Sequence, residues 1–253
     1  MNLFLDSIQR YPIKGFTAET LNQTLLQAGQ TIQGDRQYSF ENGDSGFDIY
    51  DPKHTSKGKF IVLAKIAKAA SLETIYDDAD QYLTIKKHGT IMAEGALDTT
   101  SGVRDIEFFI NDYFENELKG QAKLLTAENH SFSDVPDKCI SILNLNSIRK
   151  FEQDTALTID PIRFRANLHI DGDLPAFDEL NLINKTLTIG DVKLKVFSKI
   201  VRCPAVDVNP TTAERDTDLN KLLKQHYDHR HMGIYAMVEQ GGTISKADKI
   251  TIT

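Results

Sequence analysis

The chain contains 253 residues, of which 40% are hydrophobic and 26% are charged, and its formal net charge is -7. This length can bury one large core or two smaller ones, and the acidic balance is atypical of nucleic-acid binders, so we expect no nucleic-acid partner. The sequence shows no signal-peptide pattern, no apolar run of about 18 residues and too few cysteines for a disulfide framework. These features predict a soluble cytoplasmic protein with reduced thiols and no membrane partner.

The first half of the chain is predicted to form short strands separated by turns. The predicted strands are residues 4–13, 37–41, 72–76 and 81–86. The pair Asn42-Gly43 is typical of a hairpin turn and predicts one after the second strand. The third and fourth strands flank the acidic loop 77–80 and are expected to pair across it. We interpret that loop as a solvated turn rather than a cation site, because the spacing of a calcium loop is absent.

Three helices are predicted from the spacing of apolar residues. The first covers residues 103–114, behind a Ser/Thr-rich start and before Gly120. The second covers residues 147–152. The third covers residues 219–226 and follows the polar segment 216–218.

The last part of the chain returns to strands. The predicted strands are residues 140–143, 165–170, 186–189, 193–201, 233–239 and 249–252. Gly190-Asp191 predicts a tight turn between two of them. Regular short strands with glycine-rich turns favour a mainly β fold with a few peripheral helices (α+β), built on a barrel or a strongly bent sheet. A change of character near residues 115–125 marks the expected domain boundary.

Cys203 lies beside Arg202 and before Pro204, at the end of a predicted strand. A fixed neighbouring cation favours a thiolate, which is the form that ligates metals and attacks electrophiles. A free cysteine is also commonly a small, buried hydrophobic side chain. The residues around Cys203 fit both interpretations equally.

Four short segments concentrate basic and polar residues. They are Tyr11–Gly15, Gly34–Arg36, Arg163–Asn167 and Arg202–Cys203. If the strand ends converge, the cations of these segments surround Cys203, and such a cluster requires an anion or carboxylates to neutralise it. Arginine forks suit phosphate in particular. Each arginine taken singly is explained more simply by a surface salt bridge.

Other candidate motifs carry less chemistry. His226, His229 and His231 lie at a polar helix end, where imidazoles are more often solvated than bound to a metal. Gly241-Gly242 is interpreted as a turn, because no Lys-Ser/Thr pair of a phosphate loop follows it.

Taken in chain order, the basic segments resemble those of MOSC-domain proteins, a family named for the C-terminal domain of molybdenum cofactor sulfurase. The segments that carry the resemblance are Tyr11–Lys14, Gly34–Arg36, Arg163–Asn167 with Asp171-Gly172, Arg202-Cys203 with Val208–Pro210, Gly233–Tyr235 and Gly242–Ile244 with Ala247-Asp248. The resemblance implies a MOSC-type β-barrel over residues 119–253, preceded by an N-terminal MOSC-associated β-barrel module over residues 1–118.

The resemblance also implies a molybdenum cofactor (Mo-molybdopterin), a pterin dithiolene that carries a phosphate. By motif match, Cys203 is the thiolate ligand of molybdenum and the catalytic residue. The cofactor-binding residues implied are Lys14, Arg36, Arg165, Asn167, Arg202 and Tyr235. Relatives include the amidoxime-reducing component, which implies an oxidoreductase that reduces small N-oxygenated (N-hydroxylated) substrates. A separate ferredoxin- or flavin-type reductase is then the expected electron-donor partner.

The sequence departs from the family pattern at four positions. Gly15 replaces the serine of the amidoxime reducers, Val201 a polar residue, Ala166 a proline and Asn209 an aspartate. Two other functions therefore stay open: a sulfur carrier that uses a Cys203 persulfide, and a carrier of the cofactor that does not catalyse.

Overall fold

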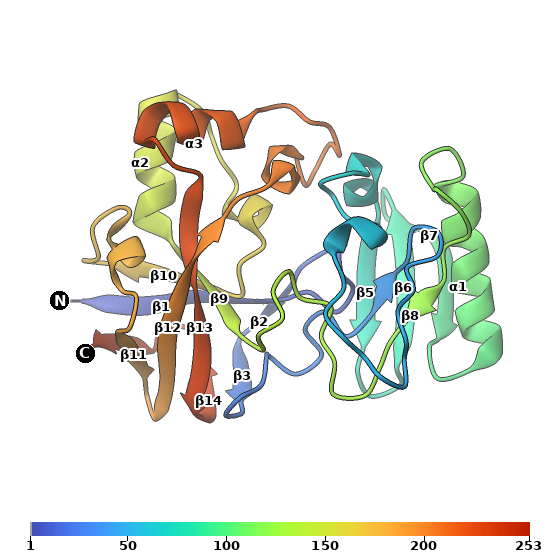
Figure 1. Ribbon diagram of the computed structural model, residues 1–253, viewed down its shortest axis with the longest axis horizontal. Coiled ribbons are helices and arrows are strands. Elements are labelled where there is room, and N and C mark those ends of the chain that lie inside the picture. The colour runs from blue at the N-terminus through green and yellow to red at the C-terminus, as the bar shows by residue number, and fades with distance from the viewer. Residues whose placement is uncertain (1) are drawn as a thin grey trace.

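The computed structural model describes residues 2–253 and shows a closed seven-stranded β-barrel beside a smaller α+β unit (Figure 1). The barrel strands are β1 (Leu3–Arg10), β9 (Ile140–Asn144), β10 (Leu168–Gly172), β11 (Thr186–Ile189), β12 (Val192–Val201), β13 (His231–Gln240) and β15 (Lys249–Ile252). Their order is β10-β9-β13-β12-β11-β15-β1, and the pairing of β1 with β10 closes the ring. Only β9 and β10 run parallel.

The barrel interior is filled by aliphatic side chains. Residues of β12 alternate between buried and more exposed positions over most of the strand, as expected for a strand with one face toward a core. Leu5, Leu168, Leu194 and Ile234 are fully buried in one apolar cluster that draws on strands from both ends of the chain. Burial of each such side chain contributes about 1.5–3 kcal/mol, which stabilises the closed ring.

The smaller unit is a three-stranded antiparallel sheet covered by one helix. Its elements are β5 (Glu73–Asp77), β6 (Tyr82–Lys87), β7 (Thr90–Ala96) and α1 (Thr100–Tyr113). The Thr99 hydroxyl accepts the Gly102 N–H and begins the helix. A side chain at Gly102 would lie 2.2 Å from the Ala96 carbonyl oxygen, so glycine is required for the close approach of α1 to β7.

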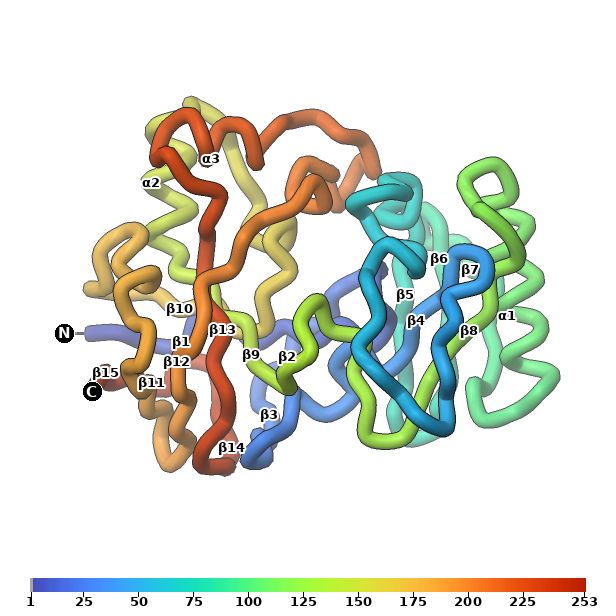
Figure 2. Tube along the Cα trace, in the orientation of Figure 1, coloured from blue at the N-terminus to red at the C-terminus, as the bar shows by residue number. Residues whose placement is uncertain are grey.

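The remaining elements complete the barrel ends and the connections. They are β2 (Glu19–Leu21), β3 (Gln23–Leu26), β4 (Ser39–Phe40), β8 (Leu124–Leu125), β14 (Gly242–Ser245), α2 (Leu145–Thr155) and α3 (Leu219–Tyr227). Phe151 of α2 and Leu223 of α3 share a buried cluster with Leu143 of β9, which packs both helices against the barrel. Figure 2 shows the two helices together at one end of the barrel.

The structure confirms the predicted fold class and the three helices, and it confirms the pairing of β5 with β6 across the acidic loop. In that loop Asp77 accepts the N–H of Ala79 and closes the turn. The turn predicted at Gly190-Asp191 joins β11 to β12. The division into residues 1–118 and 119–253 stays a prediction; β1 and β2 belong to the sheet whose other strands follow residue 139.

Two predictions are wrong. Asn42-Gly43 does not close a hairpin: β4 pairs with β8, and the Asn42 side chain instead accepts the Lys119 N–H. The strand predicted to begin at Arg165 begins at Leu168. Residues Pro161–Phe164 form a 3-10 turn, and Arg165 after it has a left-handed backbone with φ of 51°.

Candidate functional site

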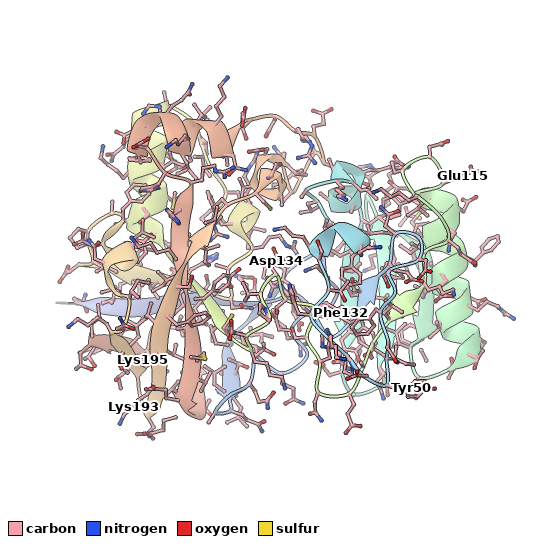
Figure 3. The ribbon with its side chains drawn as sticks, viewed as in Figure 1. Tyr50, Glu115, Phe132, Asp134, Lys193 and Lys195 are labelled. Atoms are coloured by element: carbon pink, nitrogen blue, oxygen red, sulfur yellow. The ribbon has the colours of Figure 1, made fainter. Side chains whose placement is uncertain are left out.

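A cavity of about 300 Å³ is lined by residues of both the barrel and the chain that leads to the smaller unit. It gathers every residue predicted for the site: Lys14, Arg36, Arg165, Asn167, Arg202, Cys203 and Tyr235. Segments that lie up to about 220 residues apart meet here because β1 closes the barrel against β10. Figure 3 shows Asp134, which also lines the cavity, between the barrel and the smaller unit.

Within residues 2–253 the side chains of Arg165 and Arg202 donate hydrogen bonds only to main-chain carbonyls. Arg202 donates to the carbonyl oxygens of Met232 and Phe164, each at 2.7 Å, and Arg165 donates to that of Phe16 at 2.7 Å. In each arginine one terminal nitrogen is buried without a hydrogen-bond partner. Among residues 2–253 no carboxylate forms an ion pair with either.

Burial lowers the pKa of both guanidinium groups, in each case to about 10. Both therefore stay charged at neutral pH. A buried charge without a directly paired counter-charge is costly, so these two side chains suit an anionic ligand.

Arg36 lies beside Arg165, but unlike Arg165 it forms an ion pair with a carboxylate. Asp35 binds it, and it donates to the Arg165 carbonyl oxygen at 3.0 Å. Arg36 and Arg165 lie 4.8 Å and 4.3 Å from the centroid of the Tyr11 ring, and such cation–π contacts orient both guanidinium groups. Burial raises the pKa of Tyr11 to about 12, so its hydroxyl stays neutral.

Lys14 and Lys57 share one carboxylate. The Lys14 ammonium lies 2.7 Å from Asp134 Oδ1 and 2.7 Å from the Phe132 carbonyl oxygen, and Lys57 Nζ lies 3.0 Å from Asp134 Oδ2. Burial acts to raise the pKa of Asp134, but the two ammonium groups outweigh it and hold that pKa well below the usual range. Burial lowers the pKa of Lys14.

No motif in the sequence marks Lys57 and Asp134 as site residues. Lys57 begins the short 3-10 helix Lys57–Lys59, Asp134 lies in an irregular segment, and 77 residues separate them. The only signal was indirect: a predicted cluster of cations needs carboxylates, and nothing in the sequence indicated which ones.

Cys203 lies two residues after the end of β12 and directly precedes the 3-10 turn Pro204–Asp207. Its side chain is partly buried and lines the cavity. Lys57 lines the same cavity; burial acts to lower the pKa of its ammonium group, but Asp134 outweighs burial and raises that pKa. The second cysteine, Cys139, lines the same cavity but is buried, and burial raises the pKa of its thiol to about 12. Cys139 therefore remains a thiol, and Cys203 is the accessible sulfur.

Asn167 and Tyr235 line the cavity in different ways. The Asn167 side chain accepts a hydrogen bond from the Ser141 hydroxyl at 2.7 Å and donates one to the Gln9 carbonyl oxygen at 3.2 Å, so it links β9 to β1. Tyr235 stands on β13, and its ring stacks on Phe197 at 6.2 Å between centroids. Burial raises the pKa of Tyr235, which keeps its hydroxyl protonated.

The structure explains two of the departures from the family pattern. Gly15 has φ of 87°, and a Cβ there would lie 2.4 Å from the Ile61 carbonyl oxygen, so serine does not fit this backbone. The Asn209 amide donates to Asp216 at 2.7 Å, a bond that an aspartate cannot make. Ala166 is buried, and Val201 is exposed at the cavity rim; nothing in the structure explains these two residues.

The three histidines lie outside the cavity. His229 and His231 have ring centroids 5.4 Å apart, and His229 stacks on Tyr227. In residues 2–253 no group of three His, Cys, Asp or Glu side chains is arranged to hold a metal ion. None of the helices in the same range is long and apolar enough to cross a membrane.

The charges of the cavity do not balance. Seven cations line it, against the two carboxylates Asp35 and Asp134: Lys14, Arg36, Lys57, Arg163, Arg165, Lys199 and Arg202. The excess positive charge suits a phosphate monoester, which carries about -1.5 to -2 at neutral pH, together with a thiolate. The arrangement can therefore hold a large anionic ligand next to a soft sulfur ligand.

A sequence model of the MOSC domain matches residues 127–251. Among curated relatives, a protein named molybdenum cofactor sulfurase from Drosophila willistoni is 33% identical over 121 residues, which are 47% of this chain and 15% of the relative. The protein of the same name from Caenorhabditis elegans is 28% identical over 159 residues, 60% of this chain and 22% of that protein. The chain thus spans less than a quarter of the length of either relative.

Solved structures were also compared. The YuaD protein from Bacillus subtilis aligns over 100% of this chain and 96% of its own with a TM-score of 0.46 and 12% identity. YiiM from Geobacillus stearothermophilus aligns over 45% of this chain and 53% of its own with a TM-score of 0.36 and 16% identity. The sequence match identifies residues 127–251 as a MOSC domain, and these residues include Arg165, Arg202 and Cys203 of the cavity.

Proposed function

We propose that this protein binds the molybdenum cofactor in the cavity and reduces small N-oxygenated substrates. The MOSC domain and the relatives named molybdenum cofactor sulfurase support a function related to this cofactor. The observation that carries the proposal is the pair Arg165 and Arg202, whose buried, unpartnered nitrogens line the same cavity as Cys203.

The residues present fit the cofactor. Arg165 and Arg202 would bind its phosphate and pterin, because both are charged, both line the cavity and each keeps one nitrogen without a hydrogen-bond partner. Cys203 would supply a thiolate, a soft ligand for a transition metal, to molybdenum. Lys14 and Arg36 would support the site less directly, since Asp134 and Asp35 already bind them. Asn167 and Tyr235 would shape its walls.

When bound, the cofactor supplies oxygen-atom chemistry, while the chain orients it and sets its electrostatics. Reduction of an N-hydroxylated compound replaces the N–O bond by an N–H bond and releases water, which consumes two electrons and two protons. The electrons would come from a separate ferredoxin- or flavin-type reductase. The aliphatic side chains Val62, Leu63 and Val206 line the cavity as well and would exclude water from the reacting group.

Transfer of sulfur is the second candidate function. Two observations favour it: the relatives carry the name molybdenum cofactor sulfurase, and Cys203 is the partly exposed thiol of the two. In this function the Cys203 thiolate would attack the outer sulfur of a donor persulfide and release the donor's thiolate, and the persulfide formed on Cys203 would pass that sulfur to an acceptor and regenerate the Cys203 thiolate.

Metal and pterin analysis of the purified chain tests the first proposal. Protein made in a host that synthesises the cofactor should contain both, and Cys203→Ala should lose molybdenum even where some pterin remains. Cys139→Ala is the matched control, because it removes the other cysteine of the same cavity and should keep both. Absence of metal and pterin in the wild type contradicts the proposal. Stoichiometric pterin without turnover by any reductant indicates a carrier, and a persulfide on Cys203 after incubation with a sulfur donor indicates sulfur transfer.

A further inference from the structure

The chain after Cys203 folds into a short loop that returns to the segment directly after Cys203. Val208 pairs with Arg215 across an isolated antiparallel bridge, and the Asn209 N–H donates to the Glu214 carbonyl oxygen at 2.8 Å. The Asn209 side chain accepts the Thr211 N–H and closes the turn at the tip. The loop 208–216 is therefore ordered by its own hydrogen bonds rather than free to swing.

Arg215 joins this loop to two other segments. Its Nη1 donates to the Pro204 carbonyl oxygen at 2.6 Å, and its Nη2 donates to the Leu63 carbonyl oxygen at 2.7 Å. Pro204 directly follows Cys203, while Leu63 belongs to the segment 62–64 that lines the cavity from the side of the smaller unit. Figure 2 shows the orange segment after β12 reaching toward the blue-green segment that precedes β5.

These two bonds lie at the seam between the barrel and the smaller unit. The cavity wall on one side is the segment that begins at Cys203, and the wall on the other side is the segment 62–64. No other side chain among residues 2–253 donates hydrogen bonds to both segments. Ala205 and Val208 add an apolar contact, since both pack against the core of the smaller unit.

We propose that Arg215 is a positioning residue that holds the two cavity walls together and so limits the size of the molecule that reaches Cys203. The guanidinium fork fixes the separation of the two carbonyl oxygens, because each nitrogen donates along its own direction. Small substrates enter past this closed seam, and bulky ones are excluded. The inference concerns access to the sulfur, so it holds for reduction and for sulfur transfer alike.

The test measures alkylation of Cys203 in the full chain, made without cofactor, by two maleimides of different size. N-methylmaleimide is the small reagent and N-(1-pyrenyl)maleimide the bulky one, and peptide mass spectrometry distinguishes Cys203 from Cys139. In Arg215→Ala the bulky-to-small rate ratio should rise by about tenfold, the factor that corresponds to one hydrogen bond from a charged donor. Arg215→Lys, which keeps the charge but not the fork, should give a smaller rise in the same direction.

Arg149→Ala is the matched control. It removes an arginine that binds Asp171 on the surface, outside the cavity, and it should leave the ratio unchanged. The proposal is overturned if both reagents accelerate equally, which indicates general loosening, or if the ratio stays at the wild-type value. Should Arg215→Ala fail to fold, the lysine variant decides alone: a wild-type ratio there overturns the proposal. Neither reagent needs the cofactor, so failure of the proposed function leaves this result unaffected.

Discussion

The two sides of the cavity differ in how the buried positive charges are neutralised. On the barrel side, Arg165 and Arg202 keep buried nitrogens without partners and have no carboxylate. On the opposite side, Lys14 and Lys57 share Asp134. The lysine ammonium groups are thus neutralised by a carboxylate of the protein, whereas each of the two arginines keeps one buried nitrogen without a hydrogen-bond partner.

This difference separates residues that fold the site from residues that bind its ligand. Removing one partner of a satisfied buried pair leaves an uncompensated charge and destabilises the protein. Removing a cation that waits for a ligand instead weakens binding of the ligand, with less effect on the fold. Variants on the two sides should therefore fail in different measurements.

The largest expected effect is on the arginine side. Arg202→Met keeps the bulk of the side chain but removes its charge and its free N–H group, so affinity for the cofactor should fall about a thousandfold or about 4 kcal/mol, as expected for two charge-assisted hydrogen bonds. Pterin content of the purified variant, read from the fluorescence of the oxidised pterin, measures this loss.

Arg163→Met is the control for that variant. Arg163 lines the same cavity, but Asp216 binds it at 2.8 Å. Its pterin content should stay close to that of the wild type. Equal losses in the two variants would mean that the paired and the unpaired arginine do not differ.

The sequence predicted those site residues that lie in a recognisable motif. Lys14, Arg165 and Cys203 lie in such motifs, and the closed barrel brings them together. Asp134 and Lys57 have no local pattern, because their pairing depends on how distant loops pack. For the same reason the sequence could not show that Lys14 is neutralised while Arg202 is not.

The fold was predictable where periodicity is local, as in α1 and in the hairpin of β5 and β6. Arg165 was misplaced onto a strand because its left-handed backbone depends on tertiary contacts, among them the Tyr11 ring and the Phe16 carbonyl oxygen. Asn42-Gly43 is a typical hairpin pair, but here the Asn42 side chain accepts a hydrogen bond from the Lys119 main-chain N–H. Tertiary contacts overrode the local signal at both places.

The second prediction concerns the stability of the barrel at acid pH, which depends on His169. His169 on β10 is buried against Ser7, and burial lowers its pKa to about 4, whereas an unfolded histidine titrates near 6.5. As pH falls below about 6.5 the unfolded chain gains a proton that the folded chain does not, so stability should drop by about 3 kcal/mol by pH 4. Urea unfolding at pH 7.5 and pH 4.5 measures the drop, and His169→Gln should remove most of it. An unchanged pH dependence in that variant would assign the loss to other groups.

The third prediction concerns the lysine side. Asp134→Asn leaves buried Lys14 without its counter-charge and should lower the free energy of unfolding by about 2 kcal/mol. Because its pKa is depressed in the folded protein, Asp134 contributes stability above about pH 4 that is lost as pH falls below it. The difference between wild type and variant in urea unfolding should therefore shrink in that range. Asp171→Asn, whose partner Arg149 is exposed, is the control and should cost at most about 1 kcal/mol.

The smallest expected effect concerns Arg163, the cavity arginine that is paired with Asp216. Asp216 accepts hydrogen bonds from both Arg163 and the Asn209 amide, and the hydrogen bond from Arg163 holds the pKa of Asp216 below its usual value. Asn209→Asp keeps the oxygen that closes the turn but places a second carboxylate against Asp216. Stability should fall by about 1 kcal/mol in urea unfolding, while Asn209→Ser, which adds no charge, should cost less. Because Arg163 keeps its carboxylate in both variants, pterin content should not change; a loss of pterin in either would show that this loop contributes to the anion site.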